Sequence, residues 1–541
     1  MVQGTILAAA SIIAKIIGLV YRIPLTGILG DEGNSYYSTA NDIYTIILLI
    51  SSFSLPMAIS KLMAERIEKG EYRNANRVFI CAVRFAVVAG LGLSLITYVF
   101  SGVLTKYVLH FELAKYGLRV IAPAILVFAI TGTFRGFFQG LGTMVPTAVS
   151  QILEQIINAV VSVVCAGLML RYGLKVARQM QNPSLAPAWA AAGGNFGTVV
   201  SVTVAMLFMM IVYARYRKVF AKQVRQDHTG QMEASGAIYT VLMQTLWPIV
   251  LSTVLYNIST VLDQGIFSSV LGKQGYAQQQ YAVIWGIYVG KFRVLMNVPL
   301  SLASCLGPAI VPSLAGDMSK RDRKDASRKI SMAIRYTMLL TIPCAFGLAA
   351  LGGPVITMLF HPETGVPLAA GIMQAGALMI ITYALSTLTT SILQGLGHLK
   401  EPLINCGIAL VIHVIFLFFL LRSANLNIYA VIYSNVIFAL VVCVLNALTI
   451  RRYLGYRQEY VRTFILPTIA AVIMAFGTYL VYRFFNLFAG NTISVIIAIL
   501  AGAFIYAVGL VAFHVFTVDE IAAMPKGKSI IRFFRKMGLL R

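Results

Sequence analysis

The feature that most limits how this chain can fold is a series of apolar runs, each of 18 or more residues, that recurs from one end to the other. A run of that length can cross the hydrocarbon core of a membrane as a helix. Hydrophobic residues make up 59% of the 541 residues and charged residues only 11%, too little charge for a soluble protein of this length. The sequence therefore predicts an all-α polytopic membrane protein with about fourteen transmembrane helices. We place these spans at roughly 4–29, 36–60, 78–100, 116–141, 145–170, 188–213, 239–270, 282–314, 331–352, 369–396, 403–421, 428–450, 463–484 and 491–514.

The distribution of basic residues predicts the orientation. An even number of spans places both termini on one side of the membrane. If that side is the cytoplasm, 27 of the 43 Lys and Arg residues fall in cytoplasmic loops and the C-terminal tail, and 8 fall in outer loops. Basic residues are enriched on the cytoplasmic side of membrane proteins. We therefore expect a multi-pass protein of the inner (cytoplasmic) membrane with cytoplasmic termini. The net charge of +24 then reflects orientation, and we expect no nucleic-acid partner.

Catalytic and metal-binding signatures are missing from the sequence. The six cysteines lie within apolar runs and form no CxxC pair, so they are expected to be core residues. No GxxxxGK[ST], HExxH or GxSxG motif occurs, and the loops are too short for a nucleotide-binding domain. The first apolar run lacks the features of a signal peptide and is expected to remain as a helix. We predict a protein that is not an enzyme and that holds no metal and no cofactor beyond a coupling Na⁺ or H⁺.

An internal repeat predicts the domain organisation. Gln139-Gly140-Leu141-Gly142 ends the fourth span, and Gln394-Gly395-Leu396-Gly397 ends the tenth. These points lie six spans apart, so the two halves enter the membrane in the same direction. Parallel repeats indicate two six-helix lobes around an axis normal to the membrane, with the substrate between them. We expect lobes at 1–236 and 237–456, followed by two unrepeated helices and a basic tail at 457–541.

Charged side chains inside the first span are candidates for a binding site, because such charges are costly in lipid. Lys15, Gly18 and Arg22 share one face of a helix. They predict a positive stripe that lines a cavity, and a second interpretation is that they pair with Asp42 or Asp263. The two interpretations are compatible.

The eighth span carries a polar stripe headed by a cation. Lys291 lies two residues before the first member of the stripe and points elsewhere on a regular helix, so Arg293 is preferred as the cavity cation. Pro299 could bend the helix and bring Lys291 in. The stripe consists of Arg293, Asn297, Ser301 and Ser304.

Asp263 ends a polar face on the seventh span. It could bind a monovalent cation or a proton, pair with Lys15, or lie near the outer interface. The other members of the face are Ser252, Tyr256 and Ser259.

Other charged residues are expected to be structural. Glu154 and Arg135 lie at similar depths on neighbouring spans and predict an ion pair. The adjacent acids Asp31 and Glu32 could serve a membrane glycosyltransferase as a base, but the flanking glycines favour a turn. Four arginines near span ends are expected to reach the interface. These are Arg84, Arg119, Arg135 and Arg335.

Several motifs resemble one known family over the whole chain. The matching runs are Gly18-Leu19-Val20-Tyr21-Arg22, Leu55-Pro56-Met57-Ala58-Ile59-Ser60-Lys61-Leu62, Arg135-Gly136-Phe137-Phe138-Gln139-Gly140, Pro146-Thr147-Ala148-Val149-Ser150-Gln151 and Glu154-Gln155. With these runs the sequence resembles the polysaccharide-export branch of the multidrug/oligosaccharidyl-lipid/polysaccharide superfamily, and in particular the stage V sporulation protein B and MurJ-type lipid II flippases of Firmicutes.

The resemblance implies a cationic cavity between two lobes that receives a lipid diphosphate, and a groove for the polyprenyl tail formed by the last two helices. Some members of the family bind sodium through an acid on the seventh helix, where this chain has Asp263. The matching carboxylates on helices 11 and 12 are missing, and only Asn405, Ser434 and Asn435 are available there, which argues against a sodium site. The residues predicted to bind the diphosphate are Lys15, Arg22, Lys61, Arg293 and Lys291, with Asn297, Asp42 and Ser259 as polar cavity residues and Asp263 as the candidate cation site.

The expected function is translocation of an undecaprenyl-diphosphate-linked cell-wall precursor, most of all lipid II, by a monomer that works by alternating access. The expected partners are this anionic lipid-linked oligosaccharide and membrane lipids. One rival is a drug/cation antiporter of the same superfamily, which should have an acidic cavity. The other is a polyprenyl-phosphate-dependent glycosyltransferase, which needs an outer catalytic acid and usually a large outer loop.

Overall fold

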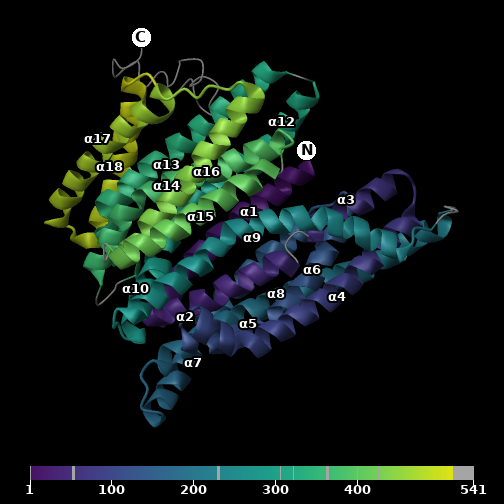
Figure 1. Cartoon of the computed structure of the whole chain (residues 1–541), viewed down its shortest axis with the longest axis horizontal. Coiled ribbons are helices and arrows are strands. Elements are labelled where there is room, and N and C mark those ends of the chain that lie inside the picture. The colour runs from purple at the N-terminus through teal and green to yellow at the C-terminus, as the bar shows by residue number, and fades with distance from the viewer. Residues whose placement is uncertain are drawn as a thin grey trace. The chain divides into compact units, whose positions relative to one another are not determined.

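The computed structural model describes residues 2–51, 55–227, 232–304, 306–320, 322–360, 365–398, 400–423 and 426–515. Within these ranges the chain forms helices joined by short connections, with no strand among them (Figure 1). Lipid offers no hydrogen-bond partners, and helices satisfy their own backbone groups. The prediction of an all-α polytopic membrane protein is confirmed.

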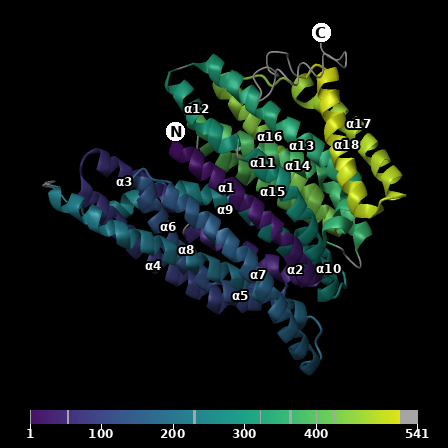
Figure 2. The same cartoon turned by 180° about the vertical axis from the view of Figure 1, so that it is seen from behind.

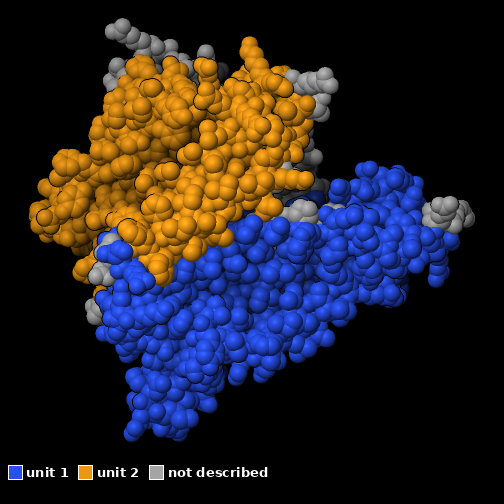
Figure 3. Space-filling view, in the orientation of Figure 1, with its two compact units in different colours: residues 1–290, 421–427 blue, residues 291–420, 428–541 orange. Residues whose placement is uncertain are grey.

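The chain divides into two compact units (Figure 3). Unit 1 contains residues 1–290 and 421–427, and unit 2 contains residues 291–420 and 428–541. The division falls inside the eighth predicted span. The two six-helix lobes at 1–236 and 237–456, which the repeat predicts, stay a prediction.

The helices of unit 1 run from α1 to α10, and the π-helical turn η3 (Tyr288–Phe292) contains the division. The elements before η3 are α1 (Val2–Val20), α2 (Arg22–Ser51), α3 (Leu55–Glu68), α4 (Tyr72–Val103), the π-helical turn η1 (Leu104–Val108), the 3₁₀ turn η2 (Glu112–Ala114), α5 (Lys115–Ile121), α6 (Pro123–Gly140), α7 (Val145–Gln179), α8 (Leu185–Gln226), α9 (Ser235–Lys273) and α10 (Gln278–Ile287). Unit 2 contains α11 (Arg293–Ser304), α12 (Leu306–Ser319), α13 (Arg323–Phe360), α14 (Val366–Gly395), α15 (Lys400–Ser423), α16 (Ile428–Leu454), the π-helical turn η4 (Val461–Ile465), α17 (Leu466–Asn486) and α18 (Gly490–Ala512).

Twelve helical segments in the described part of the chain are long and apolar enough to cross a membrane. They do not include α9 or the shorter apolar α1. The total of fourteen spans stays a prediction.

The connection between the first two spans lies where it is predicted, but it is a bend within helical structure and not a loop. Tyr21 separates α1 from α2, and helical hydrogen bonding continues across it, from Tyr21 N to Ile17 O (3.2 Å) and from Leu25 N to Tyr21 O (3.2 Å). The bend comes later, at Gly30, whose φ of 65° only glycine adopts readily. The acids at 31 and 32, predicted to form a turn, therefore begin the helical segment that follows the bend.

The outer connection after the fifth span is also shorter than predicted. The helix α7 continues to Gln179, and α8 begins at Leu185, so most of the expected loop of about 17 residues is helical. Cations are favourable near the C-terminus of a helix. Because α7 is longer than predicted, the three cations assigned to the outer loop lie on its last turns instead. They are Arg171, Lys175 and Arg178.

Two kinds of packing hold unit 1 together. Gly193 and Gly197 of α8 lie against Cys165 and Ser162 of α7 so closely that a Cβ atom would collide there. Small residues at helix interfaces let backbones approach within lipid. Figure 2 shows α7 next to α8 in unit 1. Between α4, α6 and α8 lies an aromatic cluster, formed by Phe79, Phe134, Phe137, Tyr213 and Phe220.

In unit 2, α17 and α18 pack on each other and on α13. Their remaining faces are apolar and exposed, with Phe476 at 67% and Leu500 at 67%. Exposed apolar faces suit contact with acyl chains. The groove for a polyprenyl tail stays a prediction.

Candidate functional site

The first predicted cations lie on the almost continuous run of α1 and α2. Lys15 has an exposed side chain, and Arg22 is the first residue of α2. The Arg22 guanidinium carbon lies 4.7 Å from the centroid of the Tyr37 ring. A guanidinium over an aromatic face is stabilised electrostatically. This stacking fixes Arg22 on a helix otherwise rich in apolar residues.

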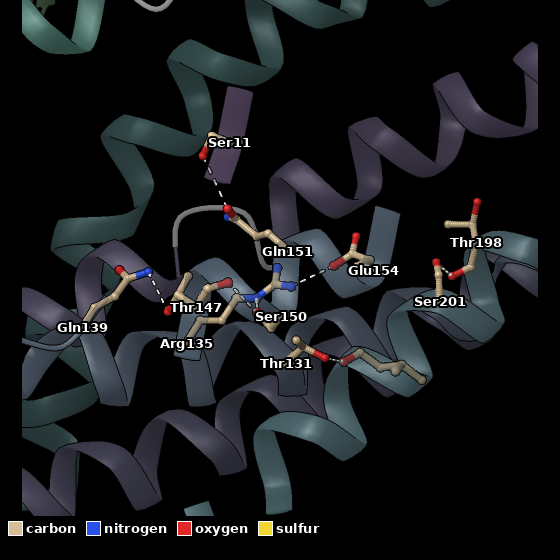
Figure 4. A network of polar contacts seen from close by, with 11 residues as sticks. Ser11, Thr131, Arg135, Gln139, Thr147, Ser150, Gln151, Glu154, Thr198 and Ser201 are labelled. Atoms are coloured by element: carbon tan, nitrogen blue, oxygen red, sulfur yellow. Dashed lines mark hydrogen bonds and ion pairs between the residues drawn. The ribbon is translucent and has the colours of Figure 1, made fainter. Parts of the chain in front are cut away.

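A polar stripe on α7 lies beside this run, and sequence reasoning missed most of it. Asn158 donates from Nδ2 to the Tyr21 hydroxyl (3.0 Å), and Ser162 donates to Asn158 Oδ1 (2.8 Å). Nearer the start of α7, Ser11 of α1 donates to Gln151 Oε1 (3.4 Å; Figure 4). The same-face spacing was visible in the sequence, at Thr147, Gln151, Glu154, Asn158 and Ser162.

Arg135 forms the predicted ion pair. Its Nη2 lies 2.8 Å from Glu154 Oε2, and its Nε donates to Ser150 Oγ (2.9 Å; Figure 4). The side chain of Arg135 is 7% exposed and that of Glu154 is 14% exposed. The expectation that Arg135 reaches the interface was therefore wrong, because a partner on the next helix satisfies it inside the unit. Arg84, by contrast, is exposed.

The other predicted residues of unit 1 lie on α9, α2 and α3. Ser259 is buried on α9 and donates to Tyr256 O (3.2 Å) of its own helix. One turn later, Asp263 is 2% exposed. Asp42 of α2 is partly exposed, and Lys61 of α3 is 66% exposed with Glu65 4.0 Å away.

The first half of the eighth span packs on α2 through two glycines spaced as GxxxG, Gly286 of α10 and Gly290 of the turn η3. A Cβ at Gly286 would collide with the carbonyl oxygen of Asp31, and one at Gly290 would lie 2.8 Å from Asn34 Cγ. The Thr26 hydroxyl donates to Gly290 O (3.4 Å). These contacts hold the first half of the eighth span against the bend in α2.

The π-helical turn η3 contains Gly290 and alters the register of the eighth span. Lys291 lies within it and is 3% exposed, whereas Arg293, the first residue of α11, is partly exposed. Asn297 is exposed one turn later. Isolated π turns are frequent at functional sites. No sequence pattern indicated this turn, and the preference for Arg293 over Lys291 as the diphosphate ligand stays a prediction.

In unit 2, the three residues that the sequence offers in place of carboxylates for a sodium site make internal contacts. Asn405 donates to Asn446 Oδ1 (2.9 Å), and Asn435 Oδ1 accepts from the Tyr383 hydroxyl (2.6 Å). The backbone oxygen of Ser434 lies 2.9 Å from a ring nitrogen of His413. These contacts tie α15, α14 and α16 together, and they supply no carboxylate.

A comparison with protein families identifies the chain. A family described as "Polysaccharide biosynthesis protein" matches residues 2–316, which is more than half of the sequence. The chain belongs to this family. Two proteins of Bacillus subtilis (strain 168) are similar to the chain along most of its length. "Stage V sporulation protein B" is 24% identical over 98% of this chain and 99% of its own length, and "Lipid II flippase MurJ" is 24% identical over 77% of this chain and 76% of its own length. The predicted resemblance to this kind of protein is confirmed.

Solved structures show the same fold. The inward closed conformation of lipid II flippase MurJ has a TM-score of 0.64, with 15% identity over 94% of this chain and 98% of that chain. The inward-facing conformation of a multidrug resistance MATE family transporter of the MOP superfamily has a TM-score of 0.66, with 16% identity over 82% of this chain and 94% of that chain. These likenesses establish the architecture of a multi-pass membrane protein.

Proposed function

We propose that this protein is a flippase that moves an undecaprenyl-diphosphate-linked cell-wall precursor, with lipid II as the expected substrate, across the cytoplasmic membrane. It would work as a monomer, by alternating access of two lobes. Its partners would be this lipid-linked anionic oligosaccharide and the surrounding lipids, and it would act as a transporter and not as an enzyme.

The observation that carries the proposal is the presence of cations within apolar spans. Lys291 is 3% exposed, and Arg22 is held against an aromatic ring. A cation at membrane depth is costly and usually marks a substrate or ion pathway. A diphosphate headgroup needs such cations, because a bare anion does not enter hydrocarbon. The planar fork of arginine can bind two phosphate oxygens at once, which suits Arg22 and Arg293 for this role.

The relatives support the proposal through their names, which describe a lipid II flippase and a sporulation protein. We infer a role in peptidoglycan or another polysaccharide of the cell wall from them. Membrane potential, inside negative, or a gradient of Na⁺ or H⁺ would return the positively charged empty carrier. Cytoplasmic termini follow from the distribution of basic residues.

The fold is shared with a multidrug transporter, so an antiporter for organic cations is the second candidate. A cation substrate would favour acids in the cavity, whereas the predicted site of this chain is mainly basic. A glycosyltransferase is less well supported, because Glu32, one of the two acids considered for it, accepts a hydrogen bond from Tyr36 (2.8 Å) and is held within unit 1.

Rescue of a bacterial strain depleted of its lipid II flippase tests the proposal. The wild-type chain should restore growth, and Arg22→Ala or Arg293→Ala should abolish rescue while the protein level persists. Arg171→Ala, at an exposed site on α7, is the matched control and should rescue fully. Arg→Lys at the two sites should keep activity if charge dominates and lose it if paired hydrogen bonds dominate. Failure of the well-expressed wild-type chain to rescue would refute the proposed function, and normal rescue by a well-expressed Arg22→Ala/Arg293→Ala double variant would refute the role of the two arginines.

A further inference from the structure

Unit 1 contains a small polar cavity whose lining includes none of the residues predicted to bind the diphosphate. Its volume is about 330 Å³. It lies where the kinked α2, the turn η2, the short connection between α7 and α8, and the first turn of α10 meet. The residues that line it are Tyr36, Glu112, Leu113, Asn182, Ser184, Gln278 and Gln279.

The lining is rich in amide and hydroxyl groups and includes no Lys or Arg. Its one carboxylate, Glu112, lies 3.1 Å from the ammonium of Lys115, which offsets its charge. Gln278 Nε2 is buried and makes no hydrogen bond within the described residues. A buried N–H group without an acceptor costs about 1–3 kcal/mol. The cavity therefore suits an uncharged ligand with hydroxyl and carbonyl oxygens, and it does not suit a phosphate.

The walls are held in place by contacts outside the cavity. The Tyr36 hydroxyl donates to Glu32 Oε1 (2.8 Å), whose second oxygen accepts from Gln279 Nε2 (3.3 Å). The ring of Phe111 packs edge-on against Tyr36, with centroids 6.5 Å apart. At the start of α10, Ala277 N donates to Gln280 Oε1 (2.9 Å). This contact caps the helix and orients Gln278 and Gln279, which lie between the two residues. A site with fixed polar groups loses little entropy on binding.

We propose that this cavity is an accessory saccharide site that binds one sugar ring bearing hydroxyl and acetamido groups. A volume of 330 Å³ is at the lower end of the range of small-molecule sites, about 300–1,000 Å³, so a single ring fits better than a whole lipid-linked headgroup. The side-chain amide of Gln278 offers a donor and an acceptor for an acetamido group, and Asn182 offers its Nδ2 donor, while its Oδ1 accepts from Ser184 N (3.1 Å). The position of the cavity on the outer side rests on the proposed orientation. In that case the site would receive the sugar of a headgroup after translocation, apart from the cations that bind the diphosphate.

Saturation-transfer NMR on the purified full-length chain in lipid nanodiscs tests the site. The probes are free N-acetylglucosamine, glucose and a short alanine peptide at millimolar concentration. The acetamido sugar should show saturation transfer from the wild type. Gln278→Leu and, as a second variant, Asn182→Ser should each weaken its binding roughly five- to tenfold, equal to the loss of one hydrogen bond of about 1 kcal/mol or slightly more. Gln179→Leu, an exposed glutamine on α7 outside the cavity, is the matched control and should bind like the wild type.

Equal binding by the wild type, Gln278→Leu and Asn182→Ser would overturn the site, as would no wild-type binding or transfer only to the peptide. The outcome is separable from the transport assay. Rescue of the depleted strain without sugar binding would refute the site and leave the proposed function intact. Binding that depends on Gln278 in a chain that does not rescue would support the site and refute the proposed function.

Discussion

The buried pair between Arg135 and Glu154 permits a quantitative prediction about stability. Arg135→Ala removes both the 2.8 Å contact with Glu154 and the 2.9 Å contact with Ser150 Oγ. The carboxylate left behind is 14% exposed, so water can satisfy it only in part. Removal of one partner from a buried pair costs about 3–5 kcal/mol, because the remaining charge is uncompensated.

This cost converts into a shift in melting temperature. An unfolding entropy of about 2.1 cal/mol/K per residue gives roughly 1.1 kcal/mol/K for a chain of 541 residues. Arg135→Ala or Glu154→Ala should therefore lower the melting temperature by about 3–4 °C. The measurement is fluorescence-detected size-exclusion chromatography after heating in detergent.

A double variant and a surface control make the reasoning refutable. Arg135→Met/Glu154→Leu leaves no unpaired charge and should recover most of the loss, since replacement of a buried pair by apolar residues is often neutral. Arg328→Ala removes an ion pair in which the arginine side chain is 72% exposed, and it should shift the melting temperature by less than about 1 °C. If the double variant melts as low as the worse single variant, the loss comes from packing and not from an unpaired charge.

Four further predictions follow from other parts of the chain. Gly286→Leu should prevent α10 from packing on α2 and abolish the folded peak in size-exclusion chromatography, whereas Gly272→Leu, which meets open space, should not; equal profiles would contradict the close approach. Glu233→Gln should weaken its paired hydrogen bonds with Arg66 (2.9 and 2.6 Å) and lower the melting temperature by about 1–3 °C, and an unchanged value would show that this contact contributes nothing. In a cysteine-free background, Gln181→Cys should react with a membrane-impermeant maleimide from outside and Lys222→Cys should not; the reverse pattern would invert the proposed orientation. A photoreactive group at Phe476 should crosslink to lipid, and crosslinks only to protein would place that exposed face of α17 away from lipid.

Much of the fold could be predicted because lipid imposes a simple rule on the sequence. Apolar runs of sufficient length identify helices, and they did so along the described chain. The ion pair of Arg135 and Glu154 was also predictable, since two opposite charges at similar depth on adjacent helices seldom stay apart. The place of the bend at Gly30 was predicted as the boundary between the first two spans, but the helix that begins directly after it and the π turn around Lys291 were not, because they depend on how α10 packs against α2. The polar partners of Tyr21 on α7 form a same-face pattern in the sequence. They are uncharged, however, and the site was predicted mainly from charged residues within the spans.

The contact between α2 and α10 also has a consequence for biogenesis. Thr26 and its acceptor Gly290 O are separated by 264 residues. At a synthesis rate of about 5–20 residues per second, α2 leaves the ribosome on the order of 13–50 seconds before its partner. Throughout that interval, the polar groups that α10 will cover face the insertion machinery or lipid. A nascent chain halted after α8 should therefore remain bound to an insertase or chaperone, and release should follow only when α10 has entered the membrane.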